Sequence, residues 1–162
     1  MGPGSGKVVR LTADLSAYPD LVVIYLGMRA RSFRGFVSLL KVGPEIQASV
    51  KAGPEGLLRH DDLLYGLFPF HIGMRQYWRN VDAMLAWTGT LPHNKWWKDF
   101  LKDSGGTTFW HETYFANGGF ESIYDDLPEG KRNFGFASFA PLGPAGASTF
   151  ARFRKAARTA AE

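Results

Sequence analysis

The sequence contains no cysteine among its 162 residues. This absence excludes disulfides, thiolate nucleophiles, iron–sulfur clusters, thiolate-ligated haem and cysteine-type zinc sites, so any metal would need histidine or carboxylate ligands. The sequence also lacks an apolar run near the roughly 20 residues that a membrane-spanning helix requires, and its first residues lack the apolar core of a secretion signal. We therefore expect a soluble, cytoplasmic protein with no membrane partner.

A basic stripe through the middle of the chain is also missing. The net charge is only +4, and much of the excess lies in residues 145–162, where Phe150 and Phe153 have helical spacing. This segment is predicted to form a basic amphipathic helix with a solvated charged face. Because aromatic residues elsewhere fall within periodic apolar patterns, they favour a core role, and we expect no nucleic-acid partner.

The pattern of apolar residues and turn residues predicts one α+β domain at residues 19–144, after a flexible lead at residues 1–18. Strands are predicted in residues 21–28, 57–67, 70–79 and 107–115. Helices are predicted to begin after Ser32, Asn80 and Pro92, which are residue types suited to a helix start. This order is that of a ferredoxin-like βαββαβ antiparallel sheet with helices on one face. The uncovered face would be rich in aromatic residues, so we expect a second copy to cover it in a dimeric α/β barrel.

The first predicted helix has two features that bear on its packing. An i, i+3, i+4, i+7 stripe predicts which of its residues face the sheet: Phe33, Phe36, Val37 and Leu40. The Gly43-Pro44 pair is predicted to interrupt the helix, with a second helical piece after it.

The segment 107–115 is the strongest site candidate because it places titratable groups in an aromatic strand. Phe109 and His111 share one face of such a strand, while Trp110 and Glu112 share the other. Whichever face is inside carries a titratable group that needs a hydrogen-bond partner, a ligand or a wet cavity. The alternative interpretation is a satisfied core histidine and a glutamate paired with an arginine at a sheet edge.

Several separated motifs resemble one known family. These motifs are residues 21–29, 76–80 and 110–114, together with Tyr124 and Leu127-Pro128. Their order is similar to that in the monooxygenase-like proteins related to a fumagillin-pathway oxygenase, within the dimeric α/β-barrel superfamily. The resemblance covers roughly residues 19–144 and implies a homodimeric enzyme with a pocket between sheet and helices. The superfamily contains cofactor-free oxygenases, haem-degrading enzymes, haem-dependent aldoxime dehydratases and small isomerases, so the fold alone does not settle the reaction.

The resemblance implies a small-molecule oxygenase that acts on a hydrophobic or aromatic substrate and needs no cofactor. His111 matches the histidine of the family's Trp-His-Glu-Thr-Tyr motif and is the candidate general base that generates a substrate carbanion. Arg75 is the second catalytic candidate, because its guanidinium group can bind an anionic oxygen or a carboxylate of the substrate. A salt bridge to Glu112 is the more ordinary role for this residue. Stacking or packing residues predicted to bind the substrate are Trp78, Gln76, Tyr77, Trp97 and Phe109. For Trp78, plain core packing is the alternative.

Two other functions stay open at this point. A haem-dependent enzyme of the aldoxime-dehydratase-like or haem-degrading class would use His93, which is predicted to face inward beside Trp96, Trp97 and Phe100. A structural histidine with a backbone partner is the alternative for His93. The same dimer could instead bind a ligand without catalysis. His60 and His71 are less constrained and could be exposed, and no pair of histidines has the spacing of a non-haem metal site.

Overall fold

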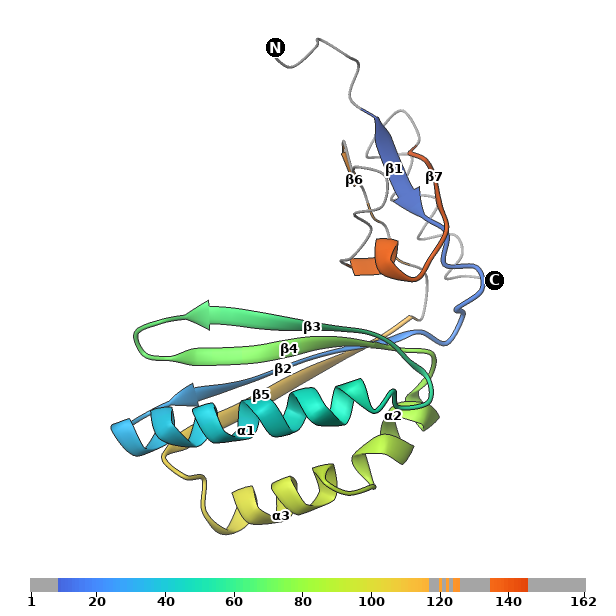
Figure 1. Cartoon of the computed structure of the whole chain (residues 1–162). Coiled ribbons are helices and arrows are strands. Elements are labelled where there is room, and N and C mark those ends of the chain that lie inside the picture. The colour runs from blue at the N-terminus through green and yellow to red at the C-terminus, as the bar shows by residue number, and fades with distance from the viewer. Residues whose placement is uncertain (1–8, 117–119, 121, 123, 126–134, 146–162) are drawn as a thin grey trace, which may run out of the picture. The chain divides into compact units, whose positions relative to one another are not determined.

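The computed structural model describes residues 9–116, 120, 122, 124–125 and 135–145. The chain divides into two compact units, one formed by Asp20–Phe115 and the other by Met1–Pro19 with Ala116–Glu162 (Figure 1). The boundary after Phe115 falls within the range 19–144 that was predicted as one domain, and each unit is described by itself. Within the described ranges, no helix has the length and apolar content needed to cross a membrane.

The larger unit is an antiparallel sheet with helices on one face. Its strands are β2 (Val22–Ala30), β3 (Leu57–Gly66), β4 (His71–Trp78) and β5 (Thr107–Phe115), in the spatial order β3-β4-β2-β5. The helices α1 (Phe33–Lys51), α2 (Val81–Thr88) and α3 (His93–Lys102) lie on the same side of this sheet (Figure 1). The ferredoxin-like α+β fold is thus confirmed, with its second helix divided into α2 and α3.

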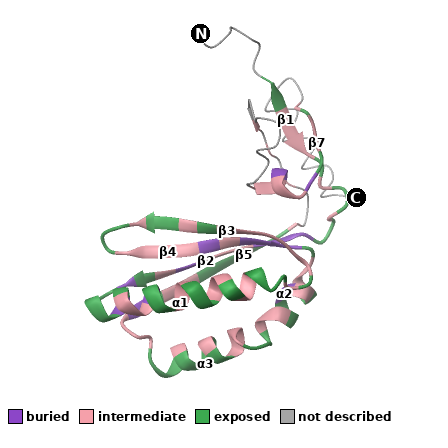
Figure 2. Ribbon diagram, viewed as in Figure 1, coloured by how far each residue is buried: buried purple, intermediate pink, exposed green. Residues whose placement is uncertain are grey.

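Strand pairing places every second residue against the helices. Val22 of β2 lies opposite Trp78 of β4, and Ile24 lies opposite Gln76. The main core forms where these residues meet α2, and its buried members are Val22, Trp78 and Met84. The partly buried residues packed against them are Ile24, Leu57, Val81, Ala83 and Trp87. Figure 2 shows buried segments along the sheet and exposed residues on the outer sides of the helices. The core therefore lies between sheet and helices, where a substrate pocket was predicted.

Helix α1 differs from the prediction in two ways. It continues through Pro44 without interruption, and its buried residues are Gly35 and Leu39 rather than the predicted stripe. Phe33 is 81% exposed, and Leu40 is exposed as well. The reason is a close backbone contact, since a Cβ at Gly35 would lie 2.1 Å from the carbonyl oxygen of Gly106. Only glycine permits this approach, which turns the Gly35 and Leu39 side of the helix toward the sheet.

The smaller unit contains a second sheet that the sequence did not predict. Strands β1 (Arg10–Ala13), β6 (Tyr124–Asp125) and β7 (Leu142–Pro144) pair in the antiparallel order β6-β1-β7, and a short 3₁₀ helix spans Gly135–Ser138. β1 lies within the lead predicted at residues 1–18, and it pairs with strands from the far end of the chain. The predicted basic C-terminal helix lies outside the described residues.

Candidate functional site

A chain of hydrogen bonds runs across the helix-facing side of the sheet. Trp78 Nε1 donates to Gln76 Oε1 at 3.1 Å, and Gln76 Nε2 lies 3.2 Å from Nδ1 of His60. His60 Nε2 in turn lies 3.1 Å from Oδ1 of Asp62. Because an indole N–H can only donate, the amide of Gln76 must donate onward to His60, whose own N–H then points to Asp62. The chain therefore fixes His60 in the neutral Nε2–H tautomer.

Trp78, Gln76 and His60 in this chain are deeply buried, whereas the Asp62 side chain is 69% exposed. The His60 side chain is only 6% exposed, so the suggestion of an exposed histidine is wrong. His60 was missed because its partner Gln76 comes from the neighbouring strand, and only strand register brings the two together. Trp78 is 0% exposed and Gln76 is 1% exposed, so the structure places both candidate substrate residues in the core.

His93 lies in an aromatic group formed by α2, α3 and β4. Its Nδ1 lies 3.2 Å from the carbonyl oxygen of Thr88, which can only accept, so this nitrogen carries the proton. Its ring centroid is 5.0 Å from that of Trp87, which is in turn 5.3 Å from that of Trp78. Burial lowers the pKa of His93, although the bond to the Thr88 carbonyl opposes this shift. His93 is thus a half-buried imidazole with its proton on Nδ1, which leaves the lone pair on Nε2.

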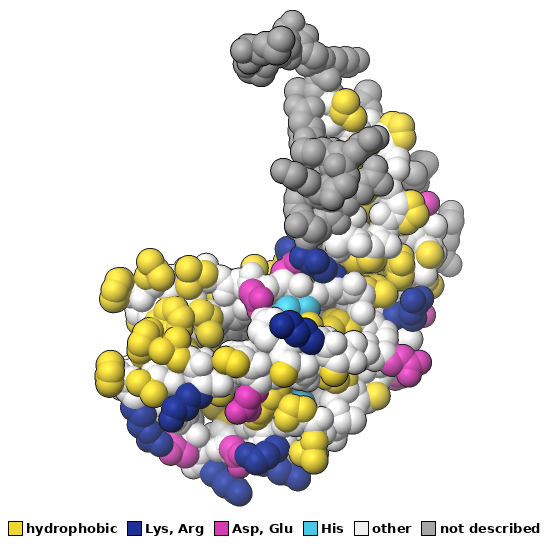
Figure 3. All heavy atoms as spheres, viewed as in Figure 1, with side chains coloured by type: hydrophobic (Ala, Val, Ile, Leu, Met, Phe, Trp, Pro, Cys, Tyr) yellow, Lys and Arg dark blue, Asp and Glu magenta, His cyan; other side chains and the backbone are white. Residues whose placement is uncertain are grey.

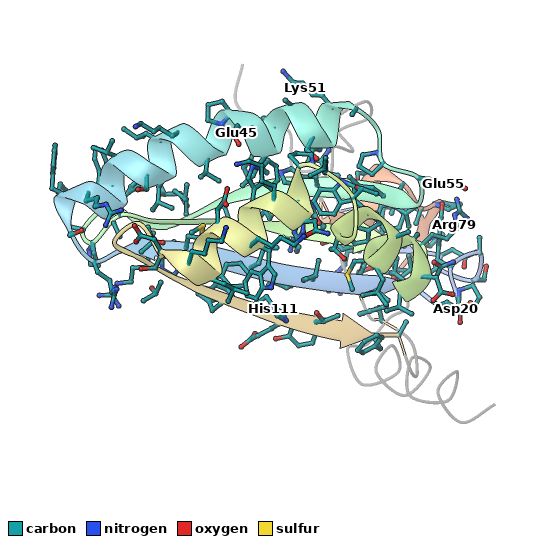
Figure 4. The ribbon with its side chains drawn as sticks, turned by 90° about the horizontal axis from the view of Figure 1, so that it is seen from below. Asp20, Glu45, Lys51, Glu55, Arg79 and His111 are labelled. Atoms are coloured by element: carbon teal, nitrogen blue, oxygen red, sulfur yellow. The ribbon has the colours of Figure 1, made fainter. Side chains whose placement is uncertain are left out.

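His111 belongs to a second aromatic group between α3 and β5. Its ring centroid is 5.8 Å from that of Phe109, which lies 5.5 Å from Trp97 and 5.9 Å from Phe100. His111 is exposed, and Figure 4, which views the unit from the side of the helices, shows it along β5. The structure therefore brings together three of the predicted site residues: His111, Phe109 and Trp97.

The two aromatic groups occupy different parts of the same sheet face. On β2, Val22 lies opposite Trp78, whereas Leu26 lies opposite His111. Four residues along a strand correspond to about 13 Å, so Trp78 and His111 do not meet around one small substrate in this arrangement. Both residues are among the predicted site residues, and their separation follows from the pairing of three strands.

Arg75 and Tyr77 lie on the opposite face of the sheet, called the open face because it carries none of the helices, although Tyr77 itself is only 3% exposed. Arg75 Nη2 lies 2.9 Å from Oδ2 of Asp61, and its Nη1 donates to the hydroxyl of Tyr25 at 3.1 Å. Burial alone would lower the pKa of Arg75, but these hydrogen bonds raise it above its ordinary value. The predicted pairing with Glu112 is wrong because Asp61 is the direct cross-strand neighbour of Arg75, while β2 separates Arg75 from Glu112. Arg75 is therefore not beside His111.

The fourth histidine, His71, is held on the open face, close to the β3–β4 turn. Trp110 Nε1 donates to Nε2 of His71 at 2.9 Å, and the ring of Tyr65 stacks on His71 with centroids 4.7 Å apart. Gly27 makes room for Trp110, since a Cβ there would lie 2.8 Å from the indole nitrogen. His71 must be neutral at Nε2 to accept the indole proton, so this contact depends on its protonation state.

We expect the His71 contact to be lost at mildly acidic pH. Burial and the nearby charge of Arg29 lower the pKa of His71 below its ordinary value of 6.5. Because the pKa is lower in the folded protein, the contact stabilises the fold above pH 6.5, and this stabilisation disappears as the pH falls through the lowered pKa. Following the indole N–H signal of Trp110 by nuclear magnetic resonance during a pH titration measures the midpoint. A midpoint at or above 6.5, or an unchanged titration in His71→Gln, would contradict the assignment.

Together, the sheet, its helices and the aromatic groups define a ferredoxin-like α+β protein with imidazoles set among aromatic rings on the helix-covered face. The chain belongs to the Monooxygenase af470-like family, whose model matches residues 21–131. This confirms the monooxygenase-like resemblance seen in the motifs, whereas a relation to the fumagillin pathway stays a prediction. No curated protein is similar enough to the sequence to match.

Several solved structures are similar to this chain at low sequence identity, and two aldoxime dehydratases among them share its fold. An aldoxime dehydratase, OxdRE in complex with butyraldoxime, has a TM-score of 0.68 and 20% identity over 94% of this chain and 43% of its own. A second aldoxime dehydratase has a TM-score of 0.67 and 19% identity, over 94% and 44%. SnoaB, a cofactor-independent oxygenase from Streptomyces nogalater, has a TM-score of 0.46 and 15% identity, over 59% and 91%. The chain thus spans less than half the length of the two aldoxime dehydratases.

Proposed function

We propose that the protein is an oxygenase-like enzyme that acts on a hydrophobic or aromatic small molecule beside His111. The observation that carries this proposal is the aromatic group of Trp97, Phe100 and Phe109 next to His111 on the helix-facing side of β5. Flat apolar rings favour a flat apolar substrate, and the exposed imidazole is accessible to it. Membership of a monooxygenase-like family supports the reaction class.

The chemistry assigned to His111 is proton transfer. A neutral imidazole takes a proton from an acidic CH₂ group of the substrate, and the resulting carbanion reduces O₂ to form a C–O bond. The imidazolium returns its proton to the peroxide, giving a hydroperoxide. Loss of water from this CH–OOH group leaves a carbonyl, so that one oxygen atom enters the product and the other leaves as water. His111 is returned to its neutral state at the end.

The open face of the sheet supports a homodimer. Tyr25, Tyr65, Trp110 and Tyr114 lie on this face, which none of the helices of the larger unit covers (Figure 1). Aromatic residues that are partly exposed on a sheet are typical of an interface. A second copy placed face to face would bury them and would also surround the charge of Arg75, which Asp61 already balances.

A haem-dependent enzyme is the second candidate, and it is favoured by the geometry of His93. The Thr88 carbonyl holds the proton on Nδ1 and leaves Nε2 free of it, which is the state that a ligand to iron requires. Trp87 and Trp96 provide an apolar wall beside the ring. Bound haem would supply an iron centre for aldoxime dehydration or for oxygen chemistry, and His93 is the residue that would hold it.

One set of measurements on the purified protein separates the candidates. For the cofactor-free oxygenase we expect a colourless protein that consumes O₂ with activated methylene or phenolic aromatic compounds, unaffected by chelators. A Soret band that is retained on purification or forms on addition of haem, and that is lost in His93→Ala, would select the haem enzyme instead. A colourless protein that binds these compounds without consuming oxygen or changing them would leave a non-catalytic ligand-binding dimer.

A further inference from the structure

Large apolar side chains gather on the surface where the tip of the β3–β4 hairpin meets the start of α1. Phe68 in the turn is 97% exposed. The rings of Phe33 and Phe36 are 6.4 Å apart and those of Phe36 and Phe70 are 5.2 Å apart, so helix and hairpin form one continuous surface. Figure 3 shows hydrophobic side chains grouped over this end of the unit. We call this surface the hairpin-tip patch, with the members Phe33, Phe36, Leu40, Leu64, Leu67 and Phe68.

Such a patch is unusual on a protein that acts alone. Monomeric proteins rarely expose contiguous apolar areas of more than a few hundred Å², and larger areas mark contacts with a partner or a membrane. The patch is separate from the open sheet face proposed for the dimer, because Phe33, Phe36 and Leu40 lie on α1, on the other side of the sheet. Dimerisation through the open face would therefore leave the helical part of the patch exposed.

The charges around the patch indicate the chemistry of its partner. The segments that form this end of the unit are residues 28–36, 64–72 and 102–108, and they contain four basic residues and one acidic residue, an excess of three positive charges (4 − 1 = 3). These residues are Arg29, Arg31, Arg34, Lys102 and Asp103. The one acid, Asp103, is paired with Arg34. An apolar surface bordered by cations fits an anionic partner.

This charge argues against two occupants supplied by the chain itself. Residues 146–162 also carry an apolar stripe, but they contain four basic residues and one acidic residue, so they would bring like charge to the patch. A second copy that presented the same patch would do so as well. The 97% exposure of Phe68 adds to the argument, because such a side chain at the tip of a turn needs a pocket in a protein partner but enters a fluid lipid interface without one.

We propose that the hairpin-tip patch docks the protein on an anionic lipid bilayer. Leu67 and Phe68 enter the boundary between headgroups and acyl chains, while Arg29 and Arg31 face the phosphate and carboxylate groups of the lipids. This revises the expectation of no membrane partner, which considered only spanning segments. The proposal does not depend on the reaction catalysed, because none of its residues belongs to the candidate site.

Vesicle co-sedimentation tests the proposal with the full chain. We expect binding to phosphatidylcholine vesicles that contain phosphatidylserine, little binding to phosphatidylcholine alone, and weaker binding as salt is raised. The double variant Leu67→Ser with Phe68→Ser should lower the partition coefficient roughly tenfold or more, from the loss of two buried apolar side chains. The matched control is Leu85→Ser, an exposed leucine of α2 outside the patch, which should bind as the unaltered protein does.

Three results would overturn the proposal. The first is no binding of the unaltered protein to the anionic vesicles, and the second is equal binding by the double variant. The third is a mass in solution that falls from dimer to monomer in the double variant, which would assign the hairpin-tip patch to a second copy. Circular dichroism of the double variant should match that of the unaltered protein, because both side chains are exposed in the turn.

Discussion

Replacing His111 by alanine is expected to lower kcat by about 100-fold to 10,000-fold, the usual contribution of a positioned general base. The substrate is whichever compound supports oxygen consumption by the unaltered protein. Because His111 is exposed on an edge strand, the same change should alter the free energy of unfolding by less than about 0.5 kcal/mol. A large loss of turnover without loss of stability separates a catalytic role from a structural one.

Thr108→Ala is the matched control for this experiment. Thr108 is exposed on the same strand but on the opposite face of the sheet, so its removal should leave kcat near that of the unaltered protein. His111→Gln keeps a polar side chain of similar size but cannot take up a proton, and it should be as slow as His111→Ala. Normal turnover in either histidine variant would remove His111 from its assigned role and would favour a site around His93.

Replacing Trp78 by alanine is expected to lower the free energy of unfolding by about 3–5 kcal/mol, the range for truncating a large buried aromatic residue. Trp78 is 0% exposed and packs with Val22, Met84 and Trp87 in the main core. Its removal would leave a cavity and would also take the donor away from Gln76 Oε1. Urea unfolding followed by circular dichroism measures the change.

Trp97→Ala is the comparison, because it makes the same change of residue type at a less buried position than Trp78→Ala. Trp97 is partly exposed at the surface of α3, so its truncation should cost less than half as much stability as that of Trp78. Because Trp97 lies beside Phe109 and near His111, it should instead weaken substrate binding and raise KM. Equal stability losses in the two variants would show that the core does not centre on Trp78 as the structure places it.

Local patterns were sufficient to predict the main elements of the larger unit. Alternation over residues 107–115 predicts a strand whose Phe109 and His111 share a face, and β5 has this arrangement. The capping roles of Ser32 and Asn80 are confirmed, since their side chains accept the N–H groups of Gly35 and Ala83. Both signals depend on a few consecutive residues, and backbone geometry converts them into structure without help from distant segments.

The candidate site was predicted only in part, because its contacts cross between elements. His111 lies beside Phe109 of the same strand, and the rings that Phe109 meets come from α3, where their spacing gave no sign of which strand they would contact. The polar chain through His60 has no signal in the sequence, because a histidine in an alternating strand looks the same whether it is buried or exposed. The pairing of Arg75 with Asp61 rather than Glu112 is likewise a matter of strand order.

By itself, the sequence determined the order of strands and helices in the larger unit, the face that each strand residue shares with its neighbours, and a family resemblance that the family model confirms. These properties follow from periodicity and motif order, which are local. Only the tertiary structure decided which histidine is buried, which carboxylate neutralises Arg75, and which side of α1 meets the sheet. The physical reason is that strand register and the close contact of Gly35 with Gly106 join residues far apart in the chain, and burial depends on those contacts.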